Sequence, residues 1–421
     1  MKKLIIVFLL ITQVSLAQQM DSVNIFNCFE AVESNHPRAG EKPLIDEQTR
    51  LKIENLKAQW YPNLDMNAQA SYQSDIVEID VNLPFDADFP SPSKDQYRVT
   101  MDVNQMIYDG GVVKYSEKME RMDEKLNKQS VEVDLYQVKD QVMEVYFGIM
   151  LLQKQRKILQ ATIKELKTKI KSVKSAVNNG TLLPSDLKKL QAEQLNLEQK
   201  LDDINSRIHS SYGVLNKLTG LETDTSTTLE LPEITLEEEG SYQRPENELF
   251  KMQKNQLDTK ENLIQAQKIP KVFAFGQFGY GKPGLNMLND EFDTFYIVGA
   301  KLSWNIWDWN QNKRKRQLAR LQKNMVDVRE NAFNKNLDIH LEKIKADISK
   351  YEKTLQKDEQ IIGLRQEVIR SSRSKLENGV ITFADYITDL NQLTKAKITH
   401  ERHKIELLKA KLNHLFTIGK I

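Results

Sequence analysis

The sequence has only one cysteine, Cys28, so no disulfide can form within the chain. Cys28 follows Ile25-Phe26-Asn27 rather than an apolar leader ending in small residues, so it does not fit the cysteine of a lipoprotein signal. We therefore expect it to be a small buried apolar side chain. Long apolar runs are also missing. Beyond the apolar N-terminal segment, no run reaches the roughly 18 residues that a membrane-spanning helix requires. The mature chain is predicted to have no helical membrane anchor.

An excess of charge of one sign is absent as well. The chain has 60 basic and 59 acidic residues, which gives a net charge of +1. Cleavage of an N-terminal signal peptide that contains Lys2 and Lys3 would change the net charge to −1. So small a charge gives no long-range attraction for nucleic acid, which is not an expected partner. Charged residues make up 28% of the chain and its mean hydropathy is −0.55, which indicates extensive solvated helix surface rather than one large core.

The N-terminus has the parts of a secretory signal peptide. Lys2 and Lys3 precede an apolar segment over 4–11, and Ser15 and Ala17 are small residues at the −3 and −1 positions of a cleavage site. We predict a signal peptide over residues 1–17, cut after Ala17.

The rest of the sequence repeats one plan twice. Two prolines of the first copy recur 208 residues later, and further matches recur at an offset of 199. The matched residues are Pro37 with Pro245, Pro62 with Pro270, Asp109 with Asp308, Asn179-Gly180 with Asn378-Gly379, and Asp186 with Asp385. We predict a first repeat over 18–219, a linker or small side layer over 220–243 and a second repeat over 244–421.

Each repeat is predicted to begin with a helix of about 25 residues that ends near its second proline, because the residue before a proline disfavours the helical conformation. A β-hairpin follows, over 63–108 in the first repeat and 271–307 in the second. In the first hairpin apolar and polar residues alternate, which gives each strand one apolar and one polar face. The second alternates less regularly, and Gly276 and Gly279 indicate bends or close backbone approach.

After each hairpin the apolar period changes to that of a coiled coil. Apolar residues follow alternating spacings of four and three from Leu159 to Val177 and from Leu337 to Leu355. We predict long helices over 112–178 and 311–377, each about 100 Å long. Asn-Gly pairs end them as glycine caps do. Return helices are predicted over 184–218 and 382–416.

The predicted strands have the length of about 9–11 residues that a tilted membrane strand needs. Lipid tolerates only closed barrels, and known barrels start at eight strands, so four strands cannot close alone. The chain is therefore expected to share a barrel with copies of itself. Aromatic residues gather where strands meet helices, as at a membrane interface, although such residues could also cap a soluble sheet. They are Trp60, Tyr61, Tyr108, Trp307 and Trp309.

A catalytic arrangement is not evident in the sequence. His400 and His403 are spaced i, i+3, whereas the zinc-protease helix requires i, i+4. The glycines near 276–284 are not followed by a helix, as a phosphate-binding loop requires. We expect no enzymatic activity, no metal and no cofactor.

The repeated motifs resemble those of the TolC-type outer membrane efflux protein family, over essentially the whole mature chain. The residues that carry the resemblance are Asn35-His36-Pro37, Trp60-Tyr61-Pro62-Asn63-Leu64, Ile107-Tyr108-Asp109-Gly110-Gly111 and Gly180-x-Leu182-x-x-Ser185-Asp186-Leu187, with second copies in Ile269-Pro270, Ile306-Trp307-Asp308 and Gly379-x-Ile381-Thr382-x-x-Asp385. The resemblance implies an α+β membrane protein: a homotrimer whose chains each give four strands to a shared 12-strand outer membrane β-barrel. A long α-helical coiled-coil barrel would continue it into the periplasm.

The resemblance also implies a function. The protein would be the outer membrane exit duct of a tripartite efflux or type I secretion system. It would passively export substrate delivered by an inner membrane pump of the RND or ABC type through a periplasmic adaptor. Matches to the adaptor-docking tips are Gly180, Leu182, Ser185, Asp186, Gly379, Ile381 and Asp385. Matches to the junction of barrel and helices are Trp60, Tyr61, Pro62, Tyr108, Asp109, Pro270, Trp307, Asp308 and Trp309.

Asp385 also matches an acidic position at the periplasmic entrance of some members of that family. The acid that those members have one helical turn further on is Thr388 here, which disfavours a strong acidic ring. We hypothesise that Asp186 and Asp385 bias opening or cation passage. The alternative for the whole chain is a soluble periplasmic coiled-coil scaffold whose hairpins form an ordinary sheet.

Overall fold

The chain folds into two compact units. A computed structural model describes residues 22–77, 91–236 and 242–421, so the predicted signal peptide lies outside the described residues. The first unit, here the sheet unit, consists of Glu41–Ser130 and Glu246–Asn331. The second, here the tip unit, consists of the residues up to Gly40 with Val131–Pro245 and Ala332–Ile421. Each unit therefore combines segments of both predicted repeats.

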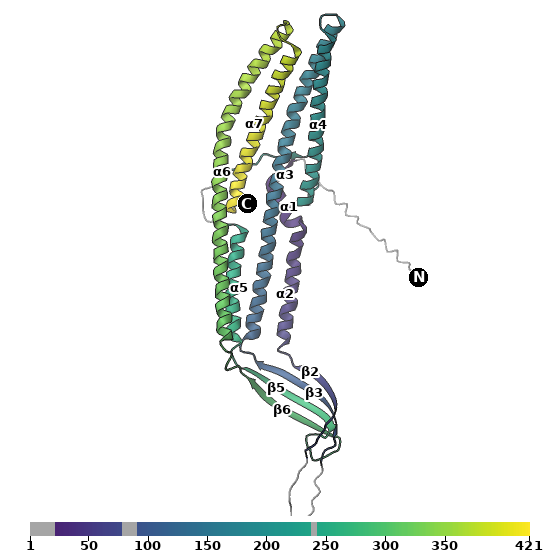
Figure 1. The fold of residues 1–421 in the computed structure, drawn as a ribbon, viewed down its shortest axis with the longest axis vertical. Coiled ribbons are helices and arrows are strands. Elements are labelled where there is room, and N and C mark those ends of the chain that lie inside the picture. Colours follow the sequence, from purple (N-terminus) through teal and green to yellow (C-terminus); the bar gives the residue numbers. More distant parts are fainter. Residues whose placement is uncertain (1–21, 78–90, 237–241) are drawn as a thin grey trace, which may run out of the picture. The chain divides into compact units, whose positions relative to one another are not determined.

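The sheet unit is built around four antiparallel strands in the order β2-β3-β5-β6. They are β2 (Asn63–Tyr72), β3 (Asp95–Tyr108), β5 (Lys271–Lys282) and β6 (Asp293–Ser303). Each hairpin comes from one repeat, and β3 and β5 join the hairpins side by side. In this unit α2 (Glu41–Ala58) lies beside the first part of α3 (Val112–Asn178), and α5 (Pro245–Ala266) lies beside the first part of α6 (Gln311–Glu377) (Figure 1).

The tip unit contains two helical hairpins. The second part of α3 pairs with α4 (Pro184–Thr219), and the second part of α6 pairs with α7 (Phe383–Ile418) (Figure 1). A short helix, α1 (Ile25–Asn35), and a 3-10 turn, η1 (Pro37–Gly40), complete the helical part. The segment predicted as a linker or side layer includes β4 (Thr228–Leu229), which pairs in parallel with β1 (Ser22–Val23).

The long helices run over the residues predicted from the sequence, 112–178 and 311–377. The coiled-coil positions explain why, since most of them are buried in the tip unit: Leu159, Ile163, Leu166, Val173, Leu337, Leu341, Ile344 and Ile348. In the described ranges, every helix is too short or too polar to cross a membrane. Cys28 of α1 is fully buried, as predicted, and burial raises the pKa of its thiol to about 12.

The end of β6 and the lengths of the helices before the hairpins differ from the sequence prediction. β6 ends at Ser303, not near residue 307, because its partner β5 begins at Lys271, which pairs with Ser303. No strand of the described chain pairs with residues 304–307. The helices before the hairpins have 18 and 22 residues and end at Ala58 and Ala266, four residues before their prolines, where single hydrogen-bonded turns take over.

The turns that lead into α3 and α6 have the same backbone shape although their sequences differ. Gly110 and Gly111 have φ angles of +73° and +87°, and their equivalents Trp309 and Asn310 have +51° and +60°. Before each turn an aspartate accepts a backbone N–H four residues ahead. A positive φ disfavours a residue with a Cβ by about 1–2 kcal/mol. The second repeat therefore adopts this turn with more strain than the first.

Gly110 is also held by packing. A Cβ added to it would lie 2.7 Å from the Cβ of Ile269 and 3.0 Å from the carbonyl oxygen of Ala266. A Cβ on Gly111 would meet only the ring of Tyr115, at 3.7 Å. The turn of the first repeat is thus packed against the α5–β5 connection of the second.

This difference predicts unequal effects of two matched substitutions. Gly110→Ala and Gly111→Ala impose the same left-handed strain, but only Gly110→Ala forces a clash, which adds about 1–3 kcal/mol of destabilisation. We expect a melting temperature several degrees lower for Gly110→Ala in thermal unfolding of the purified protein. Equal melting temperatures would show that the close contact with Ile269 does not form.

Candidate functional site

The four-stranded sheet has one face that is apolar over its central rungs, with the polar residues Asp95, Gln105, Lys282 and Thr294 toward the strand ends. The registers place on this face Leu64, Met66, Ala68, Ala70 and Tyr72 of β2, Tyr97, Val99, Met101 and Val103 of β3, Val272, Ala274, Gly276, Phe278 and Tyr280 of β5, and Tyr296, Val298, Ala300 and Leu302 of β6. The large side chains are exposed, Met66 and Tyr296 to 73% each. A monomeric soluble protein rarely exposes so large an apolar surface, so this face needs an apolar environment.

The opposite face is polar over the first hairpin. At its centre Asp102 accepts hydrogen bonds from Asn67 (2.8 Å), Thr100 (2.9 Å) and Gln277 (2.6 Å). Thr100 is buried and Arg98 is exposed. The alternation predicted for the first hairpin thus becomes a continuous polar surface across β2 and β3.

On the second hairpin two phenylalanine rings lie over glycines of the paired strand. A Cβ on Gly279 would lie 2.2 Å from the ring of Phe295, and a Cβ on Gly299 would lie 2.9 Å from the ring of Phe275. The close approach predicted at Gly279 is thus an approach of a side chain. These rings explain why the second hairpin alternates less regularly, since its polar-face positions include apolar residues that lie against the sheet.

The aromatic residues predicted to mark the junction lie at the ends of strands or in the adjoining turns. Tyr61, Trp307 and Trp309 are 69%, 69% and 73% exposed. Pro62 and Pro270 directly precede β2 and β5. Trp307 and Trp309 contact each other edge to face, with ring centroids 5.8 Å apart.

One hydrogen bond recurs at this junction in both repeats. In the first, the Gln105 amide donates to the carbonyl of Trp60 (2.7 Å). In the second, the equivalent residue Trp304 donates its indole N–H to the carbonyl of Lys268, which is equivalent to Trp60 (3.2 Å). Equivalent backbone carbonyls thus accept hydrogen bonds from two different types of side chain. Matching residue types between the two copies could therefore not predict this hydrogen bond.

The helical tips end as the sequence predicts, with glycine in the left-handed conformation. Gly180 and Gly379 have φ angles of +74° and +70°. In each tip the N–H of this glycine and that of the next residue bond to carbonyls three and five residues back, which is the Schellman arrangement. Leu182 and Ile381 are half-buried in these turns, and Ser185 is exposed.

Asp186 and Asp385, matched in sequence, have different local environments. Asp385 accepts hydrogen bonds from the hydroxyl (2.7 Å) and the N–H (2.9 Å) of Thr382 and so completes the N-terminal cap of α7. These bonds, and then the nearby cation of Lys189, lower the pKa of Asp385. Asp186 lies 3.8 Å from the same Lys189, and the N-cap residue of its helix α4 is Leu183, which makes no side-chain cap bond. Lys189 therefore offsets charge at both positions.

A polar network links the two helical hairpins of the tip unit. Glu165 of α3 accepts hydrogen bonds from Arg373 of α6 and from the hydroxyl of Tyr386 of α7 (3.3 Å). Lys169 of α3 pairs with Glu377 of α6 at 3.1 Å. The sequence did not indicate these residues. Charged residues on a coiled coil are ordinarily assigned to the solvated surface, and only the packing of the helices shows which of them form pairs.

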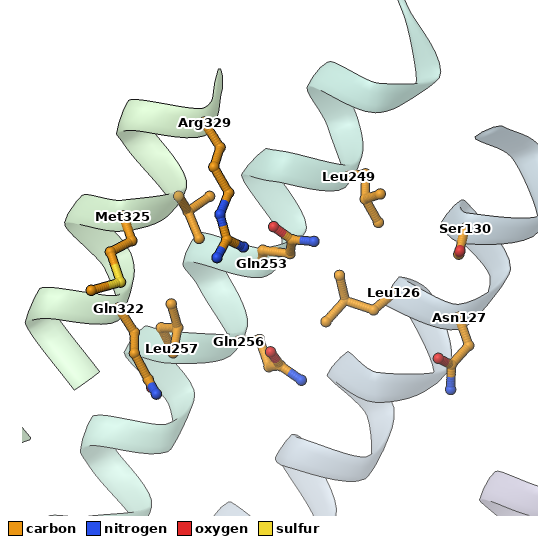
Figure 2. Close-up of a pocket in the computed structure, with 11 residues that line it drawn as sticks. Leu126, Asn127, Ser130, Leu249, Gln253, Gln256, Leu257, Gln322, Met325 and Arg329 are labelled. Atoms are coloured by element: carbon orange, nitrogen blue, oxygen red, sulfur yellow. The ribbon is translucent and has the colours of Figure 1, made fainter. Parts of the chain in front are cut away.

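The sheet unit also has a pocket between α3, α5 and α6, with a volume of about 530 Å³ (Figure 2). Its lining includes the amides of Gln253, Gln256 and Gln322 together with Met325 and Arg329. Gln256 bonds to Asp123 of α3, which links α5 to the helix of the other repeat. The lining has one hydroxyl, that of Ser130, and no histidine or carboxylate that could act as its base.

Of the two histidines noted in the sequence, His403 makes a polar contact with a neighbouring helix. The Nδ1 of His403 lies 2.6 Å from an Asp358 carboxylate oxygen, which links α7 to α6. In the ranges 22–77, 91–236 and 242–421, His, Cys, Asp and Glu side chains form no group of three suited to a metal ion.

Comparisons with known proteins agree with this geometry. Residues 46–221 match the family model described as outer membrane efflux protein. The resemblance noted from the sequence is thus confirmed, and the predicted outer membrane location with a periplasmic helical extension agrees with it. The family is one of transport channels. A comparison with curated proteins finds no match.

Solved structures share the fold across nearly the whole chain. The outer membrane channel CmeC of Campylobacter jejuni is 11% identical, with a TM-score of 0.68, covering 94% of this chain and 85% of its own. CusC, described as forming a transmembrane channel, is 12% identical with a TM-score of 0.71, covering 96% and 95%. The open state of the MtrE outer membrane channel of Neisseria gonorrhoeae is 14% identical with a TM-score of 0.66, covering 97% and 93%.

The unequal caps of the two return helices give a testable prediction. Thr382→Ala removes the cap of α7, whereas Leu183→Ala, at the matched position, removes no cap bond. We expect hydrogen–deuterium exchange about fivefold faster over 383–387 in Thr382→Ala, and unchanged exchange over 184–188 in Leu183→Ala. Equal effects in both variants would contradict the capping role.

The pH dependence of this cap has a definite sign. Because the pKa of Asp385 is lowered in the folded chain, the cap contributes fully above the ordinary carboxyl pKa and is lost as pH falls through the lowered value. After correction for intrinsic exchange rates, protection over 383–387 should therefore fall below about pH 4. Asp385→Asn should show the same loss at neutral pH.

Proposed function

We propose that this chain is the outer membrane exit duct of a tripartite efflux or type I secretion system. One observation carries the proposal: the exposed apolar face of a sheet whose other face is polar over half its width. Such a sheet separates lipid from water. The efflux family matched by residues 46–221 supports this function.

The open edges of the sheet support a shared barrel. β2 and β6 each have one strand partner, and the other edge of each has no partner in the described part of the chain. Lipid requires every backbone N–H and C=O to be bonded, so these edges must pair with copies of the chain. If β6 pairs with β2 of the next copy, the antiparallel alternation continues. We propose a homotrimer with a barrel of twelve strands.

In this arrangement the polar face lines the duct and the apolar face contacts outer membrane lipid. The Asp102 network and Arg98 would give the duct a wetted wall, through which we propose passive transport. Trp60, Tyr61, Tyr108, Trp307 and Trp309 would form the aromatic belt at the periplasmic interface. Pro62, Pro270, Asp109 and Asp308 would shape the change from strand to helix.

We propose that the chain consists of two repeats, 18–219 and 244–421, which are joined by the segment 220–243. The paired Schellman turns, the matched bonds of Gln105 and Trp304, and the matched left-handed turns support this division. The helices would form a periplasmic tunnel, with the predicted signal peptide over 1–17 directing export.

We propose that the tips dock a periplasmic adaptor, which connects the duct to an inner membrane pump of the RND or ABC type. The docking residues would be Gly180, Leu182, Ser185, Asp186, Gly379, Ile381 and Asp385, with Asp385 at the entrance. Opening would separate the two helical hairpins. That motion must break the bonds of Glu165 with Arg373 and Tyr386 and the pair of Lys169 with Glu377.

The mass of the detergent-extracted mature protein tests the proposed function. We expect extraction only with detergent, three chains per particle after correction for bound detergent, and ion conductance in a planar bilayer. These follow because four strands cannot close alone in lipid. A monomer released by carbonate without detergent would instead favour a soluble periplasmic scaffold.

The docking tips can be tested through their glycines. A Cβ at Gly180 or Gly379 would meet no atom within 4 Å, so Gly→Val there strains only the turn. We expect Gly180→Val and Gly379→Val to reduce crosslinking to the adaptor severalfold while conductance is kept. Gly148→Val, on α3 where a Cβ also meets open space, is the control. Native crosslinking in both tip variants would contradict docking at these turns.

A further inference from the structure

A second pocket of the sheet unit has the chemistry of an anion site. It lies between α5 and α6 and has a volume of about 280 Å³. All of its lining residues carry N–H donors and none is acidic: Gln265, Lys268, Asn312, Lys313, Arg316, Gln317 and Arg320. Four of these seven residues are cations. This pocket is here called the α5–α6 pocket.

Charge at the α5–α6 pocket is only partly balanced. Arg316 and Arg320 both donate to one carboxylate, that of Glu261, at 2.7 Å each, and they hold its pKa below the usual range. The pKa of Asp308 is lowered first by the hydrogen bond from the N–H of Asn312. The positive charge of Lys268 lowers the same pKa further. Lys313 has no acidic partner in the described part of the chain. Four cations thus face two carboxylates, which leaves about two positive charges.

The start of α6 increases this positive potential. Residues 313–316 read Lys-Arg-Lys-Arg, and the first turn of α6 has no acidic residue. A helix N-terminus carries a partial positive charge and ordinarily favours acidic residues. Asp308 accepts the N–H of Asn312 and offsets part of this charge, but the four successive cations at 313–316 exceed it, and a bound anion would offset the remainder.

The surroundings of the pocket identify the source of the anion. Lys268 lies three residues before β5, and its carbonyl accepts the indole N–H of Trp304. The exposed Trp307 and Trp309 precede α6. The apolar face of the sheet begins at Val272, four residues after Lys268. Tryptophan and basic residues together, at the edge of an apolar surface, are the combination that meets anionic lipid headgroups.

We infer that the α5–α6 pocket binds the phosphate of an anionic phospholipid in the periplasmic leaflet of the outer membrane. This inference rests on the proposed function, because only membrane strands bring the pocket to the headgroup level. The lipid would contact each copy of the chain at the start of α6 and tie the helices to the membrane surface.

A double substitution with a charge-matched control tests this inference. Lys268→Gln/Lys313→Gln removes two cations of the pocket. Lys271→Gln/Lys301→Gln removes two cations near the same strand ends, but on the polar face of the sheet. Each full-length protein, purified in detergent, is titrated with phosphatidylglycerol, phosphatidylcholine or inorganic phosphate. Melting temperature and lipid adducts in native mass spectrometry are measured.

We expect phosphatidylglycerol, but neither phosphatidylcholine nor inorganic phosphate, to stabilise the native protein and to form adducts. Affinity should fall about tenfold or more in Lys268→Gln/Lys313→Gln and stay unchanged in the control. Absence of any phosphatidylglycerol effect, an equal effect of inorganic phosphate, or equal losses in both variants would overturn the lipid assignment. A native protein that forms trimers and conducts in a bilayer without binding the lipid would refute this inference alone, whereas one that neither conducts nor needs detergent would refute the proposed function.

Discussion

The backbone of the four-stranded sheet imposes the constraint on which the rest of the molecule depends. In lipid an unpaired N–H or C=O destabilises by several kcal/mol, and a single chain leaves the outer edges of β2 and β6 unpaired within its described residues. One chain is therefore an incomplete structure. In the proposed trimer the edges pair, the apolar face meets lipid, and the polar face encloses water.

The two proposed repeats share backbone features while their side chains differ. Lys128 pairs with Asp46 in the first repeat, and the equivalent pair in the second has the charges reversed, Asp327 with Lys254. Gly110 and Gly111 correspond to Trp309 and Asn310 in the same left-handed turn. In the proposed barrel each position recurs at a different place around the wall, so the second repeat can take on new chemistry while the first retains the ordinary glycine turn. The basic start of α6 is an instance of such divergence.

The sequence predicted the features that depend on local rules. Proline, glycine and the coiled-coil spacing located the long helices and their Gly180 and Gly379 caps, and strict alternation located the first hairpin. Features that depend on long-range packing were not predicted. The end of β6 is set by where β5 begins, and the environment of Glu165 is set by helices more than 200 residues away. The unequal environments of Asp186 and Asp385 depend on whether Thr382 or Leu183 precedes the helix.

The pairing of β3 with β5 has a consequence for how the protein is made. Asp102 and Gln277, bonded across these strands, are 175 residues apart in the chain. During synthesis and export the first hairpin therefore emerges long before its neighbour exists, with its apolar face unprotected. Non-local pairing of this kind slows folding and exposes strands that can aggregate. The four-stranded sheet can assemble only once the chain through Ser303, the end of β6, has been made, so the early hairpin must be kept from aggregating until the late one arrives.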